Sequence, residues 1–253
     1  MEPVLGAYGK MPSRGDFVRR RLPSCFIEPW DDWLQRAIMR AREELGERWR
    51  QLYLNGPIWR FMLAPQVLGE QVAAGVMMPS IDSVQRHFPL TLVALLPSDA
   101  NPFRLALEEK WFLDLEEIGL ACLDPDVQPD GLDAKLDGLA APAYEAEPLA
   151  RRETTSAQER TGWTLPQERA SYEPQLYPTL LDEWARGMWG PYSLWATSGS
   201  DAVEPSFRVF QGLPEPEAFS SLLSDEVQPQ PEAALLPPDD DVGCAAAANE
   251  EIP

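Results

Sequence analysis

"FPLTLVALLP", residues 88–97, is the stretch that decides the fold. From Leu90 to Leu96 it is nearly all apolar. A short apolar run of this kind is typical of a central strand that is covered on both faces of its sheet. The stretch therefore predicts a sheet with other layers packed above and below it.

Further runs with strand character lie on either side of this one. The segments 58–64 and 71–79 are separated by too few residues for a helical crossover, so we expect them to pair antiparallel. Two more runs, 192–199 and 206–214, come late in the chain.

Three apolar stripes at helical spacing predict the covering layers. The first runs from Glu28 to Leu54 as one helix about 40 Å long, with Pro29 in its first turn. The second begins with Asn101 as its cap and continues to Cys122, and the third spans about 178–189. Helices on both faces bury all three stripes, so we predict a three-layer α/β/α sandwich with a mixed, partly antiparallel sheet.

The composition divides the chain into four parts. We expect an α/β domain over 1–123 and a partly ordered linker or insert over 124–177, which is polar, proline-bearing and aperiodic. Residues 178–225 should form a smaller C-terminal segment, a helix and strands that complete or flank the domain. The chain has no Lys or Arg beyond Arg208, and 226–253 are acidic and proline-rich, which predicts a disordered acidic tail.

The overall charge narrows the class of partner. The 253 residues carry a formal net charge of −20, which disfavours nucleic acid and anionic membranes as partners. No apolar run is long enough for a transmembrane helix, and the N-terminus lacks the features of a secretion signal. The three cysteines are scattered, which favours reduced thiols, so we expect a cytoplasmic protein.

The opening loop "GAYGKMPSRGDF", residues 6–17, has some features of a phosphate-binding loop. Gly9-Lys10 is followed by Met11-Pro12, however, so the hydroxyl that would hold magnesium is missing. We interpret the stretch as a turn after a strand, with Gly9 and Gly15 supplying positive φ angles and Pro12 ending the strand pairing.

The sequence offers few residues for metal binding or for catalysis by other mechanisms. His87 is the single histidine, so a site with several histidine ligands is excluded, and any Ser–His or Cys–His catalysis would have to use it. It precedes an apolar strand and is expected at an edge or surface. The abundant carboxylates show no catalytic spacing. We expect no catalytic residue, no metal, no cofactor and no enzymatic activity.

A second loop repeats the pattern of the first. "MMPSIDSVQRHFPL", residues 77–90, has a proline, a polar turn, an aspartate and an arginine before an apolar run. Our hypothesis is that Asp16 and Asp82 pair with arginines or cap helices, pinning the two loops at one edge of the sheet. The candidate interaction or loop-pinning residues are Gly9, Lys10, Pro12, Gly15, Asp16, Phe17, Pro79, Ser80, Asp82, Arg86, Phe88 and Pro89.

A cluster of three arginines follows the first loop. Arg19, Arg20 and Arg21 are candidates for charged docking, either to an acidic partner surface or to the chain's own tail. They fit a solvated face equally well.

Two motifs together resemble one family. Gly-Lys-x-Pro-x-x-Gly-Asp-Phe at 9–17 and Arg-x-Phe-Pro-Leu-Thr at 86–91, with "EPWDDWLQ" and "PIWRFMLAP" between them, look like the TagF (ImpM) accessory proteins of bacterial type VI secretion systems. The resemblance is strong over 5–97 and looser over 180–222. Gln85 departs from the pattern, because the family is expected to have glycine there.

The resemblance implies a three-layer α/β/α domain from a Gram-negative bacterium. It implies a post-translational repressor of type VI secretion that binds a forkhead-associated (FHA) scaffold protein in the cytoplasm, without nucleic acid or membrane insertion. Two alternatives stay open. One is an enzyme whose pocket is lined by loops 9–17 and 79–89, with Lys10, Asp16, Asp82, Arg86 and His87 inside it. The other is a stable structural subunit of the apparatus.

Overall fold

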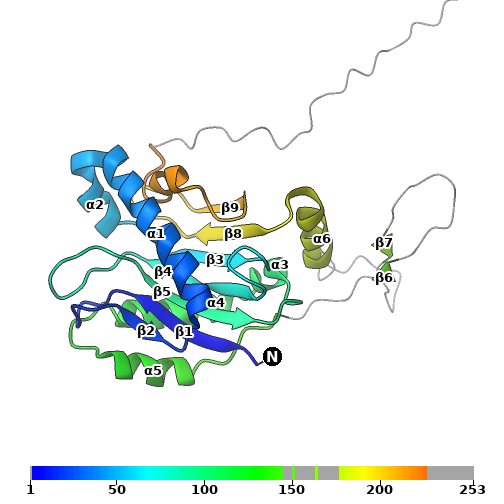
Figure 1. Ribbon diagram of the computed structural model, residues 1–253, viewed down its shortest axis with the longest axis horizontal. Coiled ribbons are helices and arrows are strands. Elements are labelled where there is room, and N and C mark those ends of the chain that lie inside the picture. The colour runs from blue at the N-terminus through cyan, green and yellow to red at the C-terminus, as the bar shows by residue number, and fades with distance from the viewer. Residues whose placement is uncertain (1, 145–149, 152–162, 165–176, 227–253) are drawn as a thin grey trace, which may run out of the picture.

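The computed structural model describes residues 2–144, 150–151, 163–164 and 177–226 (Figure 1). Seven strands form one sheet in the order β2-β1-β5-β4-β3-β8-β9, and β6 pairs with β7 in a separate two-stranded sheet. The strands are β1 (Val4–Gly9), β2 (Val18–Arg20), β3 (Trp59–Leu63), β4 (Val72–Met78), β5 (Leu90–Leu96), β6 (Ala150–Arg151), β7 (Trp163–Thr164), β8 (Tyr192–Thr197) and β9 (Ser206–Gln211).

Helices cover both faces of the large sheet, which confirms the α/β/α layers. They are α1 (Ser24–Leu45), η1 (Gly46–Arg48), α2 (Trp49–Leu54), α3 (Pro102–Leu105), α4 (Glu109–Ala121), α5 (Pro129–Asp137), α6 (Tyr177–Trp189) and η3 (Pro216–Leu222). Side chains of α1, α2 and η3 share one hydrophobic core with one face of the sheet, and α3, α4, α5 and α6 share a second core with the other face. In Figure 1, α1 runs diagonally across the sheet.

The sheet differs from the expected mixed sheet because every described strand pair is antiparallel. Four neighbouring pairs, β1–β2, β3–β4, β4–β5 and β8–β9, are joined by short connections, which must reverse the chain. The two long helical connections link β2 to β3 and β5 to β8, and neither pair is adjacent in the sheet. No helical crossover therefore creates a parallel neighbour. The antiparallel pairing of β3 with β4 and the complete burial of β5 are as expected.

The expected helix from Glu28 to Leu54 is interrupted. α1 begins earlier, at Ser24, so Pro29 lies inside the helix rather than in its first turn. α1 ends at Leu45 and is capped by Gly46, whose φ of 52° lies in the left-handed region that glycine adopts readily. The chain then makes one 3₁₀ turn before α2.

The second predicted helix is also two helices. Asn101 caps α3 as expected, because its side chain accepts a hydrogen bond from the Arg104 N–H at 2.9 Å. A turn follows in which Leu107 and Glu108 donate to carbonyls three residues back. This turn leaves Leu107 exposed, and α4 then begins as a separate helix that buries Trp111, Phe112 and Leu115.

α6 matches the third predicted helix in position but not in its buried face. It turns Ala185, Thr179 and Pro178 inward. Leu181, Trp184 and Met188, which the stripe pattern places in the core, are exposed in the described structure.

The predicted linker contains a helix that the sequence analysis missed. α5 begins with Pro129 at its first position and buries Leu132 and Leu136 in the second core. Most of the remainder of 124–177, and all of the predicted tail except Glu226, lie outside the described residues. Within the described part of the chain, no helix combines the length and apolarity needed to cross a membrane.

Candidate functional site

The two motif loops lie side by side at one end of the sheet. β1 pairs with β5, with Gly9 opposite Leu90, so the connection 10–17 after β1 meets the connection 79–89 before β5. The Ser83 N–H donates to the Arg14 carbonyl at 3.0 Å, and the Ser80 hydroxyl donates to the Lys10 carbonyl at 2.8 Å. We call these two connections the paired loops.

A buried ion pair lies between the paired loops. The Lys10 ammonium is 3.1 Å from Asp82 Oδ2, and the two side chains are 5% and 0% exposed. The ammonium also donates to the Gly15 carbonyl at 2.9 Å and lies 4.1 Å from the centre of the Phe17 ring. Lys10 therefore holds its own loop and the neighbouring loop at once.

Both carboxylate oxygens of Asp82 accept hydrogen bonds. Its Oδ1 accepts hydrogen bonds from the backbone N–H groups of Val84 and Arg86, and its Oδ2 accepts one from Arg86 Nε at 2.6 Å. Burial alone would raise the pKa of this carboxyl, but the bonds from Arg86, Lys10 and Val84 outweigh burial and lower the pKa to about 2. The expected pairing of Asp82 with an arginine is present, and Arg86 Nη2 donates to the Gly15 carbonyl across the loops.

Asp16 does not take part in this cluster. It is exposed, and the described residues give its side chain neither an ion pair nor a hydrogen bond. The expectation that both aspartates pin the loops was therefore wrong for Asp16. The chain uses Lys10 in its place, because a long side chain on one loop reaches the buried carboxylate on the other.

A tyrosine that the sequence analysis did not select ties α2 to the second loop. Tyr53 donates to the Ser80 carbonyl at 2.9 Å, and its oxygen accepts from the Ser80 N–H at 3.1 Å. Burial is the main cause that raises the pKa of the Tyr53 hydroxyl. Its distance from the loop in sequence leaves no local signal for this contact.

The two loop glycines have different roles. Gly9 has a φ of 136°, and a Cβ placed on it would stand 2.0 Å from the Pro89 carbonyl oxygen. Gly15 lacks a positive φ, and its nearest neighbour would be Ser83 Oγ at 3.5 Å. The prediction of positive φ is confirmed for Gly9 and wrong for Gly15, whose carbonyl rather than its conformation is used by Lys10 and Arg86.

The other motif residues frame the cluster. Phe17 stacks on Tyr8 at 5.5 Å between ring centres and meets the edge of Phe88 at 4.8 Å. Pro89 and Ser80 are buried, and Pro12 and Pro79 are half-buried. Gln85 takes a φ of 65°, so the turn keeps a left-handed residue at the place where glycine was expected.

The arginine cluster has partners inside the chain. Arg20 lies 2.8 Å from Asp130, and Arg21 lies 2.8 Å from Asp137 (both on α5), while Asp133 lies within 3.5 Å of both arginines. Arg19 is exposed, with its guanidinium 5.7 Å from the centre of the Tyr8 ring. Two of the three arginines thus fix α5 against β2.

A surface pocket lies beside the first loop. It is lined by Arg14, Asp16, Phe17, Val18, Arg19, Arg20 and Pro129. Phe17 is 38% exposed there although its other side packs on Tyr8 and Phe88. The pocket therefore offers one aromatic side chain among three guanidinium groups.

The five residues of the enzyme alternative do not share one environment. Lys10 and Asp82 are buried against each other, and Arg86 pairs with Asp82 from an exposed position. Asp16 is exposed without a partner in the described structure, and His87 packs edge-on against Tyr53 at 5.4 Å. Burial and the positive charges of Arg42 and Arg50 lower the pKa of His87. Among the described residues no group of three or more metal-binding side chains is found.

Comparison with known proteins assigns the fold to a family. No curated protein matches the chain. The crystal structure of PA0076 from Pseudomonas aeruginosa PAO1 is similar, with 33% sequence identity and a TM-score of 0.76, over 92% of this chain and 100% of that one. The model of the TagF N-terminal domain, described as type VI secretion system-associated, matches residues 6–139. That range holds both motif loops and reaches through α5, and because it is more than half of the sequence, the chain belongs to the TagF N-terminal domain family associated with type VI secretion.

Proposed function

We propose that this protein is a non-catalytic, post-translational repressor of the type VI secretion system that acts in the cytoplasm by binding an FHA scaffold protein. Membership of the TagF N-terminal domain family supports the link to secretion. The Lys10–Asp82 pair is the observation that supports a non-catalytic role, because both charged groups are buried and already bonded within the paired loops. An ammonium and a carboxylate held in this way support a framework rather than a reacting centre.

The pocket around Phe17 is the docking element in this proposal. Aromatic and arginine side chains contribute most to binding energy at protein interfaces. The pocket lies between the first motif loop and Pro129 at the start of α5. The other side of the Phe17 ring packs against Lys10, Tyr8 and Phe88. A fixed aromatic ring loses little conformational entropy when a partner covers it.

Secretion and capture assays test the proposal together. Deleting the gene should raise effector release, and the tagged protein should capture the FHA scaffold protein from cell extract. The variant Arg14→Gln/Arg19→Gln should restore repression poorly and capture less scaffold. The matched control Arg36→Gln/Arg40→Gln removes two exposed guanidinium groups of α1 and should behave as wild type. Lower release in the deletion strain would contradict a repressor.

A further inference from the structure

A second basic surface lies where the end of α1, α2 and the second motif loop meet. Trp49 stacks on Tyr53 with 5.0 Å between ring centres, and Tyr53 in turn meets His87 at 5.4 Å. The Arg42 guanidinium lies 5.4 Å from the centre of the Trp49 ring. Arg50 is close enough to His87 to lower its pKa, as Arg42 also does. We call Arg42, Trp49, Arg50, Tyr53 and His87 the α2 face.

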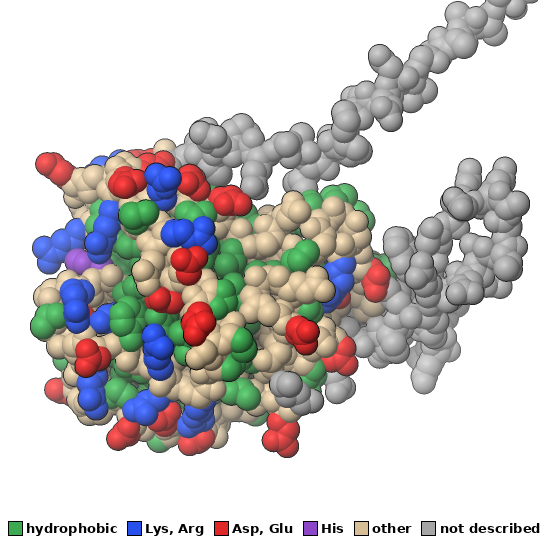
Figure 2. All heavy atoms as spheres, in the orientation of Figure 1, with side chains coloured by type: hydrophobic (Ala, Val, Ile, Leu, Met, Phe, Trp, Pro, Cys, Tyr) green, Lys and Arg blue, Asp and Glu red, His purple; other side chains and the backbone are tan. Residues whose placement is uncertain are grey.

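The arginines of the α2 face have no carboxylate partner in the described structure. Most described arginines form an ion pair, including Arg48, which lies 2.6 Å from Glu226. Arg42 and Arg50 are exposed, and the described residues offer neither of them an ion pair. Figure 2 shows the histidine side chain with Lys and Arg side chains beside and above it at the left of the molecule.

A hydrogen-bond donor in the same face is also unsatisfied. Trp49 is 7% exposed, and its indole N–H is buried with no acceptor among the described residues. The other four tryptophan N–H groups of this core among the described residues, those of Trp30, Trp33, Trp59 and Trp195, each have an acceptor. An unpaired buried donor is destabilising, so the packing beneath this face leaves one polar group unsatisfied.

We propose that the α2 face is a docking surface for an acidic segment of a partner protein. The two exposed guanidinium groups match the acceptors of a few carboxylates. This inference depends on the proposed function in one respect: the FHA scaffold protein of the secretion system would supply the acidic segment. A long polyanion such as a nucleic acid is disfavoured as the partner, because it would extend beyond the α2 face and be repelled by the rest of a chain whose net charge is −20. A short acidic segment would contact the α2 face alone.

The single histidine makes this proposal measurable in the full chain. A short oligoglutamate peptide is added at low ionic strength, and the ring resonances of His87 are followed by NMR over pH. Bound carboxylates should raise the pKa of His87, because they offset the positive charges of Arg42 and Arg50. An oligoglutamine peptide of the same length should leave it unchanged.

Two variants separate the α2 face from the pocket around Phe17. Arg42→Gln/Arg50→Gln should weaken oligoglutamate binding about fivefold or more and abolish the peptide's effect on His87. Arg14→Gln/Arg19→Gln removes the same charge from the other surface and should keep the effect. Peptide binding that survives the first variant, or that only the second variant removes, would overturn the proposal.

Two further outcomes distinguish a failure of this proposal from a failure of the proposed function. If oligoglutamate leaves the pKa of His87 in the full chain unchanged, the proposal that the face binds an acidic partner segment is overturned. If oligoglutamate binds as expected but the FHA scaffold protein is not captured, the α2 face stands and the proposed function fails.

Discussion

The Lys10 ammonium and the Asp82 carboxylate lie 3.1 Å apart, each withdrawn from solvent and each supplied by a different loop. Removing one partner of a buried pair leaves the other charge uncompensated, which costs about 3–5 kcal/mol. Asp82→Ala should therefore lower the free energy of unfolding by about that amount in chemical denaturation. Asp16→Ala, at an exposed position with no partner in the described structure, should stay within about 0.5 kcal/mol of wild type. Equal stability of the two variants would contradict the assigned role of Asp82.

The same carboxylate predicts a pH dependence. The pKa of Asp82 is lowered from 3.8 to about 2 in the folded protein, so its stabilising contribution is fully present above pH 4 and is lost as pH falls through 2. The difference in unfolding free energy between wild type and Asp82→Asn should shrink by about 2 kcal/mol over this interval. Denaturation of both proteins at a series of pH values measures it. A constant difference would show that Asp82 has an ordinary pKa.

Gly9, at the end of β1, and Gly15, in the first motif loop, give a prediction with an internal control. Gly9→Ala must move the Pro89 carbonyl away from a Cβ 2.0 Å distant and must also hold a φ of 136°, so it should cost about 3 kcal/mol or more. Gly15→Ala meets only ordinary contacts and should change stability by less than about 1 kcal/mol. Thermal unfolding of both variants tests this. A tolerated Gly9→Ala would mean that β1 does not approach β5 as described.

Much of the fold was predictable because buried strands and helices leave a local pattern of apolar residues in the sequence. β5 stood out as an apolar run, and β3, β4, β8 and β9 lie within their predicted segments. The break at Gly46 was missed because the apolar stripe continues through α2. The spacing of Leu132 and Leu136 after Pro129 was the available signal for α5, and polar neighbours concealed it.

The candidate site was only partly predictable, for a different reason. The sequence pattern selected Asp82 and Arg86, which pair within one loop as expected. It did not show that Lys10 pairs with Asp82, because these two residues sit on separate loops that only the sheet brings together. A helical stripe likewise shows that α6 has an apolar face without showing that this face points outward. Long-range pairing and the choice of covered face are properties of the assembled layers.

Gln85 offers a stabilising substitution. A non-glycine residue in the left-handed region is disfavoured by about 1–2 kcal/mol, and glycine pays about 0.5–1 kcal/mol of extra chain entropy. Gln85→Gly should therefore raise the free energy of unfolding by about 0.5 kcal/mol. Gln35→Gly, inside α1, is the contrasting variant and should lower it by about 1 kcal/mol. A loss of stability in Gln85→Gly would indicate that the Gln85 side chain makes a compensating contact.

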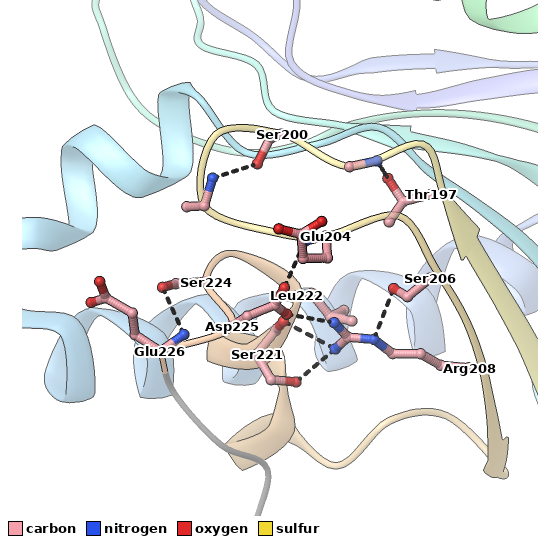
Figure 3. Close-up of polar contacts among 12 residues, drawn as sticks. Thr197, Ser200, Glu204, Ser206, Arg208, Ser221, Leu222, Ser224, Asp225 and Glu226 are labelled. Atoms are coloured by element: carbon pink, nitrogen blue, oxygen red, sulfur yellow. Dashed lines mark hydrogen bonds and ion pairs between the residues drawn. The ribbon is translucent and has the colours of Figure 1, made fainter.

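Arg208 joins β9 to the C-terminal 3₁₀ segment (Figure 3). Its Nη1 donates to the carbonyl and hydroxyl of Ser221 at 3.0 Å each, and its Nη2 lies 3.1 Å from Asp225. Asp225 also accepts from the Glu204 N–H at 2.6 Å, and the Trp59 indole N–H donates to the Leu222 carbonyl at 2.9 Å. One guanidinium thus closes a network that holds η3 against the sheet.

Arg208→Met keeps an unbranched side chain as far as the position of Nε and removes the guanidinium donors. Ser221 and Asp225 then lose their charged partner, so the variant should lose about 2 kcal/mol of stability. We expect the loss to be local, because the Arg208 contacts hold η3 and the residues after it rather than the pairing of β4 with β5. Hydrogen exchange should accelerate for amides of 216–226 and stay unchanged for β4 and β5. Arg36→Met, which removes an exposed pair within α1, should change neither measurement. Uniform acceleration across the sheet in Arg208→Met would show that η3 and the sheet unfold as one unit.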